Sequence, residues 1–150
     1  MTNLSMLVND MAHWHGMKPP LSPNKDEVFL YQEYINGKNP VCLLGMTKEL
    51  VPFCHVAVDL NPIEIGKPTI KSDWNDLTGN FKVVIGDGVI NLAGMELVDR
   101  MLKISERFIC RVFMAKQPGM KYATYFPTSF PRSSLVITTQ PDIAFVVWDQ

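Results

Sequence analysis

The chain has 150 residues, of which 47% are apolar and 19% are charged, a composition that excludes an intrinsically disordered protein. This length predicts a single domain, because domains usually span roughly 100 to 200 residues. The 14 basic and 15 acidic side chains leave a net charge of -1. Because nucleic-acid binding normally requires a clustered cationic excess, we expect no nucleic-acid partner.

The cysteines and histidines do not show the spacing of metal ligands. Cys42, Cys54 and Cys110 lie in apolar segments, which predicts reduced, buried thiols. His13 and His15 are two positions apart, and such residues point away from each other on a helix. We therefore expect no bound metal. No segment approaches the ~18 apolar residues of a membrane helix, and the N-terminus lacks a basic targeting lead, so we expect a cytoplasmic protein without membrane contact.

The first part of the chain predicts two helices. Apolar residues at spacings of three and four indicate a short helix over residues 3–16. A second helix is predicted to begin with Ser22 as its N-cap and Pro23 in its first turn, and to end at Gly37. We therefore divide a single domain into an N-terminal helical segment, 1–38, and an α/β core, 39–150.

From residue 41 onward, short apolar runs are separated by polar breaks, a pattern typical of strands buried on both faces. The runs are VCLLG, HVAVDL, PTIKSD, FKVVIGDG and RFICRVF. Residues 91–106, between the last two runs, carry apolar side chains at helical spacing and predict a helix. Strands that alternate with helices imply a parallel sheet with right-handed crossovers.

The last two apolar runs, SLVITT and IAFVVWDQ, are separated only by the turn-forming residues Gln140, Pro141 and Asp142. This spacing predicts a β-hairpin, which makes the end of the sheet antiparallel. The predicted fold is therefore Rossmann-like α/β, with a mostly parallel sheet, an antiparallel C-terminal hairpin and helices on both faces.

The first four apolar runs stop at small or polar residues. Ligands of an open α/β sheet bind beyond the carboxyl ends of its strands, so these stops form the candidate site. A carboxylate accepts both hydroxyls of a ribose, an aromatic ring covers a purine, and glycines let backbone amides approach a ligand. The pattern is typical of a nucleoside site. The candidate residues are Gly45, Met46, Thr47, Asp59, Leu60, Asp73, Trp74, Gly86, Asp87 and Gly88.

These segments resemble, in order and polarity, the class I S-adenosylmethionine-dependent methyltransferase family over most of residues 22–114. VCLLGMTKEL is similar to the first strand and glycine loop of a small bacterial branch, in an LG-x-T-x-E-L form. HVAVDLN and IKSDWNDL are similar to the segments that carry the ribose and adenine acids, and FKVVIGDGVINL is similar to the fourth strand, which flanks the transferable methyl. The resemblance implies S-adenosylmethionine as the cofactor, with Asp59 at its ribose and Asp73 at its adenine.

Each candidate residue also has a purely structural interpretation. Asp59 and Asp73 can begin turns or cap the helices that follow them. Trp74 can pack at the rim of the sheet. Gly86 and Gly88 can serve only the turn after their strand.

Two other nucleotide-binding motifs fit less well. GDGVIN nearly spells the dinucleotide fingerprint, but Asn91 replaces its third glycine and Asp87 places a negative charge where a pyrophosphate must lie. Gly66-Lys67-Pro68-Thr69 resembles the end of a phosphate loop, but the earlier glycine is missing and Pro68 removes an amide. Both nicotinamide and nucleoside triphosphate binding are therefore disfavoured.

Two functions stay open. The first is a methyltransferase that acts on an unidentified acceptor, with Asp87 as the nearest candidate base. The second is a non-catalytic methyltransferase-like module that binds S-adenosylmethionine or S-adenosylhomocysteine, or a partner. Pro52 lies among the 13 residues between Gly45 and Asp59, and a proline-rich segment replaces the usual helix after residue 113, which favours the second function. The incomplete set of covering helices is also consistent with a homodimer.

Overall fold

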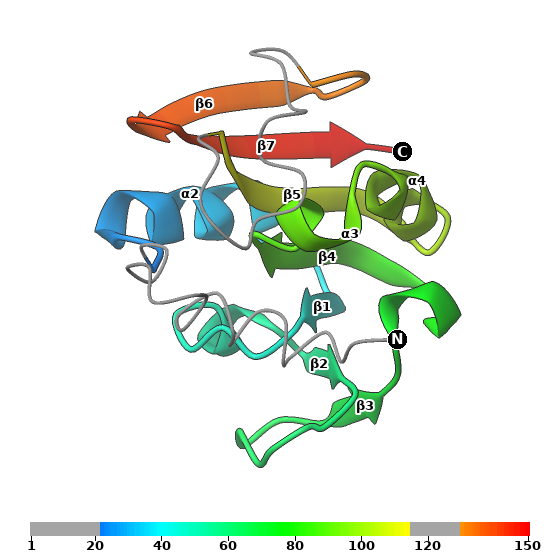
Figure 1. The fold of residues 1–150 in the computed structure, drawn as a ribbon. Coiled ribbons are helices and arrows are strands. Elements are labelled where there is room, and N and C mark those ends of the chain that lie inside the picture. The colour runs from blue at the N-terminus through cyan, green and yellow to red at the C-terminus, as the bar shows by residue number, and fades with distance from the viewer. Residues whose placement is uncertain (1–21, 115–129) are drawn as a thin grey trace, which may run out of the picture.

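A computed structural model describes residues 22–114 and 130–150, which fold around one central sheet (Figure 1). The helix predicted over residues 3–16, both histidines within it, and most of the proline-rich segment lie outside the described residues. The strands are β1 (Val41–Leu44), β2 (Val56–Asp59), β3 (Thr69–Lys71), β4 (Phe81–Asp87), β5 (Ser105–Phe113), β6 (Leu135–Gln140) and β7 (Ile143–Asp149). The helices are α2 (Lys25–Ile35), α3 (Ile90–Ala93) and α4 (Glu96–Leu102), with 3₁₀ turns η2 (Val51–Phe53) and η3 (Trp74–Asp76).

The seven described strands have the order β3-β2-β1-β4-β5-β7-β6. The first five pair in parallel, and β7 runs antiparallel to both β5 and β6. The strand order reverses beside β1, which places the carboxyl ends of β1 and β4 next to each other at a topological switch point. The predicted fold class is confirmed, including the antiparallel C-terminal hairpin.

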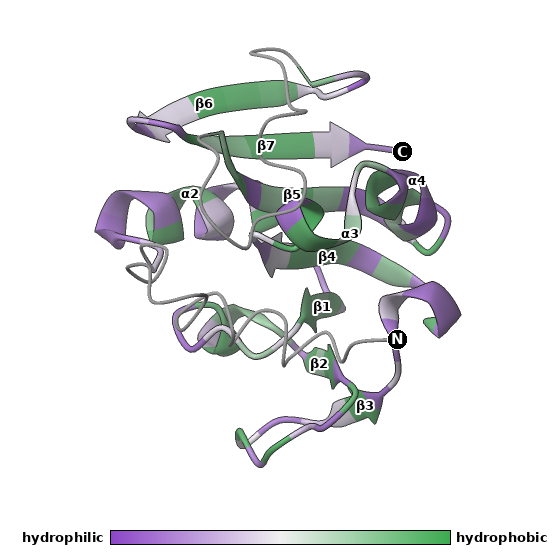
Figure 2. Ribbon diagram, viewed as in Figure 1, coloured by the Kyte–Doolittle hydropathy of each residue, from purple (hydrophilic) through white to green (hydrophobic). Residues whose placement is uncertain are grey.

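Helices cover both faces of the sheet. On one face, α2 contributes Tyr31 and Ile35 to a buried cluster with side chains of β1, β4, β5 and β7. On the other face, α3 and α4 contribute Ile90, Leu97 and Met101 to a second cluster. Figure 2 shows apolar residues along β5 and β7 and polar residues on the outer turns of α2. The predicted continuous apolar runs therefore match strands that are buried on two sides.

Helix α2 begins two residues later than predicted. Its N-cap is Asn24, whose side chain accepts a hydrogen bond from the Glu27 N–H at 2.8 Å, while the Glu27 carboxylate accepts one from the Asn24 N–H at 2.9 Å. This reciprocal capping box satisfies two backbone donors, whereas Ser22 lies outside the helix. At the other end, Asn36 adopts the left-handed conformation immediately before Gly37.

The helix predicted over residues 91–106 is two short helices. Gly94 separates α3 from α4 with a φ of 87°, a left-handed value that an L side chain rarely adopts. The second helix ends at Leu102, and Ser105 already belongs to β5. The apolar period continues across Gly94 because both short helices face the same cluster, which is why the pattern alone predicted one helix.

The connection between β1 and β2 contains only the single 3₁₀ turn η2, with Pro52 at its start. The crossover between β1 and β2 is therefore short and contains no α-helix. Pro52 suits the first turn of a helix, where its missing N–H needs no partner.

The three cysteines are buried free thiols, as predicted. Burial raises the pKa of both Cys42 and Cys110 to about 12, so these two thiols stay protonated at neutral pH. Within residues 22–114 and 130–150, no helix is both long and apolar enough to cross a membrane.

Candidate functional site

The structure brings the four predicted loops to one edge of the sheet. Parallel pairing aligns Leu44 with Val58, and Asp59 with Lys71, so β1, β2 and β3 all end at this edge. Pairing of Leu43 with Ile85 places the end of β4 on the other side of β1. The loops after β3, β2, β1 and β4 therefore follow one another along the carboxyl edge.

The loop after β1 turns sharply at Gly45. This residue has a φ of 86°, and its N–H donates to the Val58 carbonyl at 2.8 Å. The Met46 sulfur accepts a hydrogen bond from the Ile63 N–H at 3.4 Å, and the Thr47 carbonyl accepts one from the Leu50 N–H at 2.9 Å. The loop is thus held against the end of β2 by its own backbone.

Asp59 ends β2 with one carboxylate oxygen unsatisfied. Its side chain is fully buried, and Oδ1 accepts a hydrogen bond from the Asn61 N–H at 2.8 Å. Oδ2 is buried without a hydrogen-bond partner among the described residues. Asp59 does begin a turn, as its structural interpretation proposed, but that turn uses only one oxygen. Because an unpaired buried acceptor is costly, Oδ2 is a candidate acceptor for a ligand hydroxyl.

Asp73 presents the same feature after β3. The residue is 7% exposed, and its Oδ1 has no hydrogen-bond partner among the described residues. Asp73 is the N-cap residue of η3 and its carbonyl accepts a hydrogen bond from the Asp76 N–H at 3.1 Å, but its side chain makes no capping hydrogen bond. Trp74 packs against the apolar cluster beneath α3 and α4, and Leu60 is half-buried.

Asp87, at the end of β4, is held by a residue that sequence reasoning missed. Arg111 of β5 donates from Nε to Oδ1 at 2.7 Å and from Nη2 to Oδ2 at 3.0 Å. Its Nη1 donates to Glu27 Oε1 at 2.9 Å. Arg111 and Glu27 are fully buried, and the Asp87 side chain is 11% exposed.

The carboxylates of this cluster differ in their surroundings. Burial raises the pKa of Asp87, and the hydrogen bond from Arg111 opposes this rise. Burial also acts to raise the pKa of Glu27, but hydrogen bonds from Thr139 and Asn24, together with Arg111, outweigh it and lower that pKa. Glu27 is thus held in its ionised form by donors from the N-cap of α2, from β5 and from β6.

Tyr31 and two glycines fix the loop after β4. The Tyr31 hydroxyl donates to the Gly86 carbonyl at 2.6 Å and accepts from the Arg111 N–H at 3.0 Å. The Gly88 N–H donates to the Arg111 carbonyl at 3.0 Å. A Cβ added at Gly86 would lie 2.7 Å from a methyl carbon of Val89, which real Cβ contacts do not allow. The glycines therefore permit close packing around Asp87.

The sequence does indicate that Arg111 is a buried charge. The run RFICRVF places one arginine between Cys110 and Val112, both of which are fully buried in the structure. A charged side chain within a buried strand requires partners of opposite charge. The sequence does not show which acids pair with Arg111, because Glu27 is 84 positions away from it along the chain.

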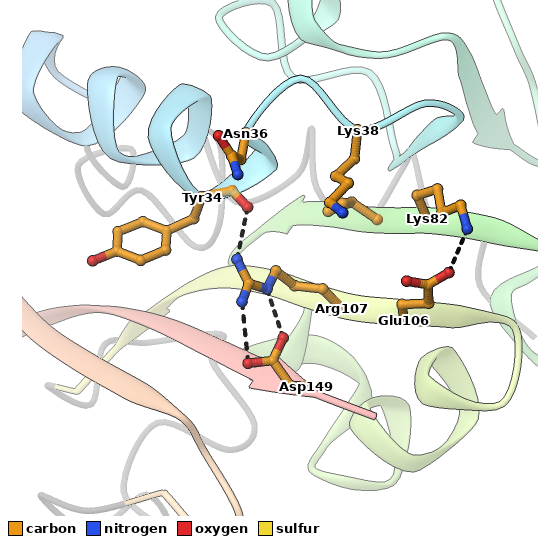
Figure 3. Close-up of a pocket in the computed structure, with 8 residues that line it drawn as sticks. Tyr34, Asn36, Lys38, Lys82, Glu106, Arg107 and Asp149 are labelled. Atoms are coloured by element: carbon orange, nitrogen blue, oxygen red, sulfur yellow. Dashed lines mark hydrogen bonds and ion pairs between the residues drawn. The ribbon is translucent and has the colours of Figure 1, made fainter.

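A separate cavity lies at the opposite, amino edge (Figure 3). It has a volume of about 340 Å³ and is lined by charged side chains of β4, β5 and β7. Arg107 donates to Asp149 at 2.6 Å, and Lys82 lies 2.7 Å from Glu106. These ion pairs are partly exposed and mutually satisfied, unlike the unpaired oxygens of Asp59 and Asp73. The carboxyl edge is therefore the better candidate site.

Solved structures share the fold of this chain at low sequence identity. Magnesium protoporphyrin IX methyltransferase from Synechocystis PCC 6803, solved with bound S-adenosylmethionine, matches 79% of this chain and 72% of its own, with a TM-score of 0.50 and 14% identity. Monomeric WbdD matches 93% of this chain with a TM-score of 0.56 and 12% identity. The chain has a class I methyltransferase fold.

A structure of another protein is similar over most of its own length. Protein 1320 of Thermoplasma acidophilum matches 82% of this chain and 85% of its own, with a TM-score of 0.52 and 13% identity. The match covers only 44% of the monomeric WbdD chain. No family model matches the sequence, and no curated protein matches it. The likeness is therefore one of fold.

Proposed function

We propose that the protein binds S-adenosylmethionine at the carboxyl edge of its sheet and transfers the methyl group to an acceptor that is still unidentified. The observation that carries this proposal is the buried Asp59 carboxylate at the end of β2, whose Oδ2 is unpartnered among the described residues. The methyltransferase fold supports it, and so does the bound S-adenosylmethionine of the Synechocystis enzyme.

The donor and acceptor groups of the site suit an adenosyl group. Asp59 Oδ2 would accept a ribose hydroxyl, and Asp73 Oδ1 would accept an N–H of adenine. Gly45 has no side chain to block the approach of a ligand to the loop after β1. Met46, Thr47, Leu60, Trp74, Gly86 and Gly88 belong to the same proposed site.

When bound, the cofactor would supply a methyl group on a sulfonium: an acceptor lone pair would form a bond to the methyl carbon, and the sulfur would keep the electron pair of the broken bond and leave as a thioether. The protein promotes such a displacement mainly by alignment, an effect worth up to ~7 to 11 kcal/mol in model systems. Arg111 holds both oxygens of Asp87. We therefore assign Asp87 to shaping the loop after β4 and not to proton transfer.

Calorimetric titration with S-adenosylmethionine and with S-adenosylhomocysteine tests the proposal. We expect both ligands to bind, and we expect Asp59→Ala to weaken both at least about tenfold through the lost ribose hydrogen bonds. Glu106→Gln, at the amino edge, is the matched control and keeps both affinities. Absence of heat at millimolar ligand in the wild type would overturn the proposal, and full affinity in Asp59→Ala would overturn the ribose assignment.

A non-catalytic binding module is the second candidate. Two observations favour it. The crossover between β1 and β2 is a single 3₁₀ turn. Asp87, the nearest candidate base, accepts hydrogen bonds from Arg111 on both carboxylate oxygens. Methyl-labelled S-adenosylmethionine offered with amine, thiol, phenol and carboxylate acceptors separates the two functions. Label transferred to an acceptor establishes the enzyme, whereas binding without transfer across the panel favours the module.

A further inference from the structure

Strand β6 is the outermost strand at the end of the sheet opposite β3 (Figure 1). Among the described residues it pairs with β7 alone, so one side of its backbone has no strand partner there. Alternate residues of an antiparallel strand direct their N–H and C=O groups to opposite sides, so part of these groups in β6 point away from β7. β6 therefore offers backbone donors and acceptors to one further strand.

The two edges of the sheet differ in how they resist a further strand. Edge strands usually avoid such pairing by being short or by carrying lysine or proline. β3 has three residues, follows Pro68 and ends at Lys71. β6 has six residues, LVITTQ, with neither charge nor proline. Its register with β7 shifts only between Thr138 and Gln140, so residues 135–138 form a regular, unprotected edge.

The apolar side chains of β6 are only partly covered. Leu135 and Ile137 pack against the cluster on the α2 face, and Val136 packs against the cluster on the α3 and α4 face, yet all three are half-buried. In the neighbouring strand β7, residues 143–148 are all buried. Figure 2 shows apolar residues along most of β6. Both clusters therefore reach this edge of the sheet, and the described residues do not close them there.

A second copy of β6 can pair with this edge in only a few registers. Two identical strands related by a two-fold axis pair antiparallel around one central residue, and residues opposite each other point to the same face. Centring on Val136 places Val136 opposite itself and Leu135 opposite the partner's Ile137. Centring on Leu135, Ile137 or Thr138 instead places an apolar side chain opposite serine, threonine or glutamine. The apolar part of β6 is thus self-complementary in one register.

We propose that the protein forms a two-fold symmetric dimer in which β6 of each copy pairs antiparallel with β6 of the other, centred on Val136. The occupant of this edge is a second copy of the same chain. Three apolar cross-strand pairs stabilise the contact, and no like charges meet because β6 is uncharged. The sheet then continues through both copies. This interface is independent of the proposed methyl transfer.

Light scattering on the full chain in solution measures the assembly. We expect a mass of about twice 17.0 kDa, which falls toward 17.0 kDa on dilution. Val136→Lys places two lysines opposite each other at the two-fold axis, and we expect the dissociation constant of the dimer to rise at least about tenfold.

Ile70→Lys is the matched control. Ile70 is also half-buried, lies in the middle of the edge strand β3 and packs against the same cluster as Val136, so its substitution should leave the dissociation constant of the dimer unchanged. Thermal unfolding followed by circular dichroism verifies that both variants are folded.

Disulfide cross-linking tests the register. Val136→Cys brings two thiols opposite each other, with Cα atoms about 4.5 to 5.5 Å apart, a separation that a disulfide spans. Thr138→Cys is the control: Thr138 is more exposed than Val136, but in this register its two copies lie about 13 Å apart along the strands, beyond the reach of a disulfide. The native cysteines are buried. We therefore expect mild oxidation to give a covalent dimer with Val136→Cys and not with Thr138→Cys.

Three results would contradict this interface. A wild type that stays monomeric throughout the dilution series would overturn it, and so would a dimer that Val136→Lys leaves intact. Cross-linking of Thr138→Cys at least as strong as that of Val136→Cys would overturn it as well, because random collisions favour the more exposed thiol. None of these results bears on the calorimetric titration with S-adenosylmethionine, so the proposed function stands or fails separately.

Discussion

Arg111 and Glu27, which are 84 positions apart in the sequence, meet inside the protein with Nη1 and Oε1 separated by 2.9 Å. The contact joins α2 to the carboxyl end of β5. Because Arg111 also holds Asp87, the same guanidinium links α2 to the loop after β4. The N-terminal helix and the candidate site are therefore parts of one buried polar network.

Removal of Arg111 should be strongly destabilising. Arg111→Met leaves Glu27 and Asp87 as buried carboxylates without their cation, and we expect a loss of about 3 to 5 kcal/mol in the free energy of unfolding. Urea denaturation followed by circular dichroism measures this loss. Lys82→Met breaks the exposed pair with Glu106 and should cost less than about 1 kcal/mol. Equal losses in the two variants would contradict the buried network.

The contribution of Glu27 to stability should disappear in acid. Hydrogen bonds and Arg111 lower the pKa of Glu27 below its ordinary value of 4.5, against the opposing effect of burial. The unfolded state then binds the proton first, so the stabilisation by Glu27 is fully present above pH ~4.5 and is lost as the pH falls through the folded pKa. Glu27→Gln should be less stable than the wild type at pH 7. The difference should narrow toward pH 3; a constant difference in urea denaturation would refute this linkage.

Asp59→Asn should stabilise the free protein while it weakens ligand binding. Asparagine retains an oxygen for the Asn61 N–H but removes a buried charge whose Oδ2 has no partner among the described residues. We expect a gain of about 1 kcal/mol in thermal or urea unfolding without ligand. The exposed control Asp76→Asn should change stability by less than about 0.5 kcal/mol. Destabilisation by Asp59→Asn would show that the Asp59 charge is compensated in the free protein.

The loop after β4 requires glycine at position 86. Gly86→Ala brings a Cβ to 2.7 Å from the Val89 side chain, and we expect a loss of about 1 to 3 kcal/mol. Val89→Ala removes the clashing methyl groups, so the double variant should lose less than the sum of the two single changes. A double-mutant cycle by urea denaturation measures this coupling, and strict additivity would rule out the clash as the cause.

The start of α2 provides a test of the capping box. Asn24→Ala removes the acceptor for the Glu27 N–H, and we expect a cost of about 1 kcal/mol. Ser22→Ala changes the residue that the sequence pattern favoured as N-cap and should cost almost nothing, because Ser22 lies outside the helix. Thermal unfolding of both variants distinguishes the two caps, and the reverse order of effects would restore Ser22 as the cap.

Much of the fold was predictable because strand formation is a local property of apolar runs. All seven described strands overlap predicted runs, and the hairpin was predicted because Pro141 and Asp142 form its turn. The boundaries of helices were less predictable. Gly94 interrupts a continuous apolar period through its backbone conformation, and Asn24 caps α2 through reciprocal side-chain hydrogen bonds with Glu27, and neither feature is recorded in apolar spacing.

The sequence by itself determined the order of the elements and the polar residues at the ends of the strands, because both follow from apolar spacing along the chain. Tertiary structure alone decided which of those acids keep a carboxylate oxygen without a hydrogen-bond partner. Asp59 and Asp73 keep an unpartnered oxygen among the described residues, whereas Asp87 is held by Arg111. Such pairings join residues from distant strands and helices, and their distances arise only when the sheet is assembled.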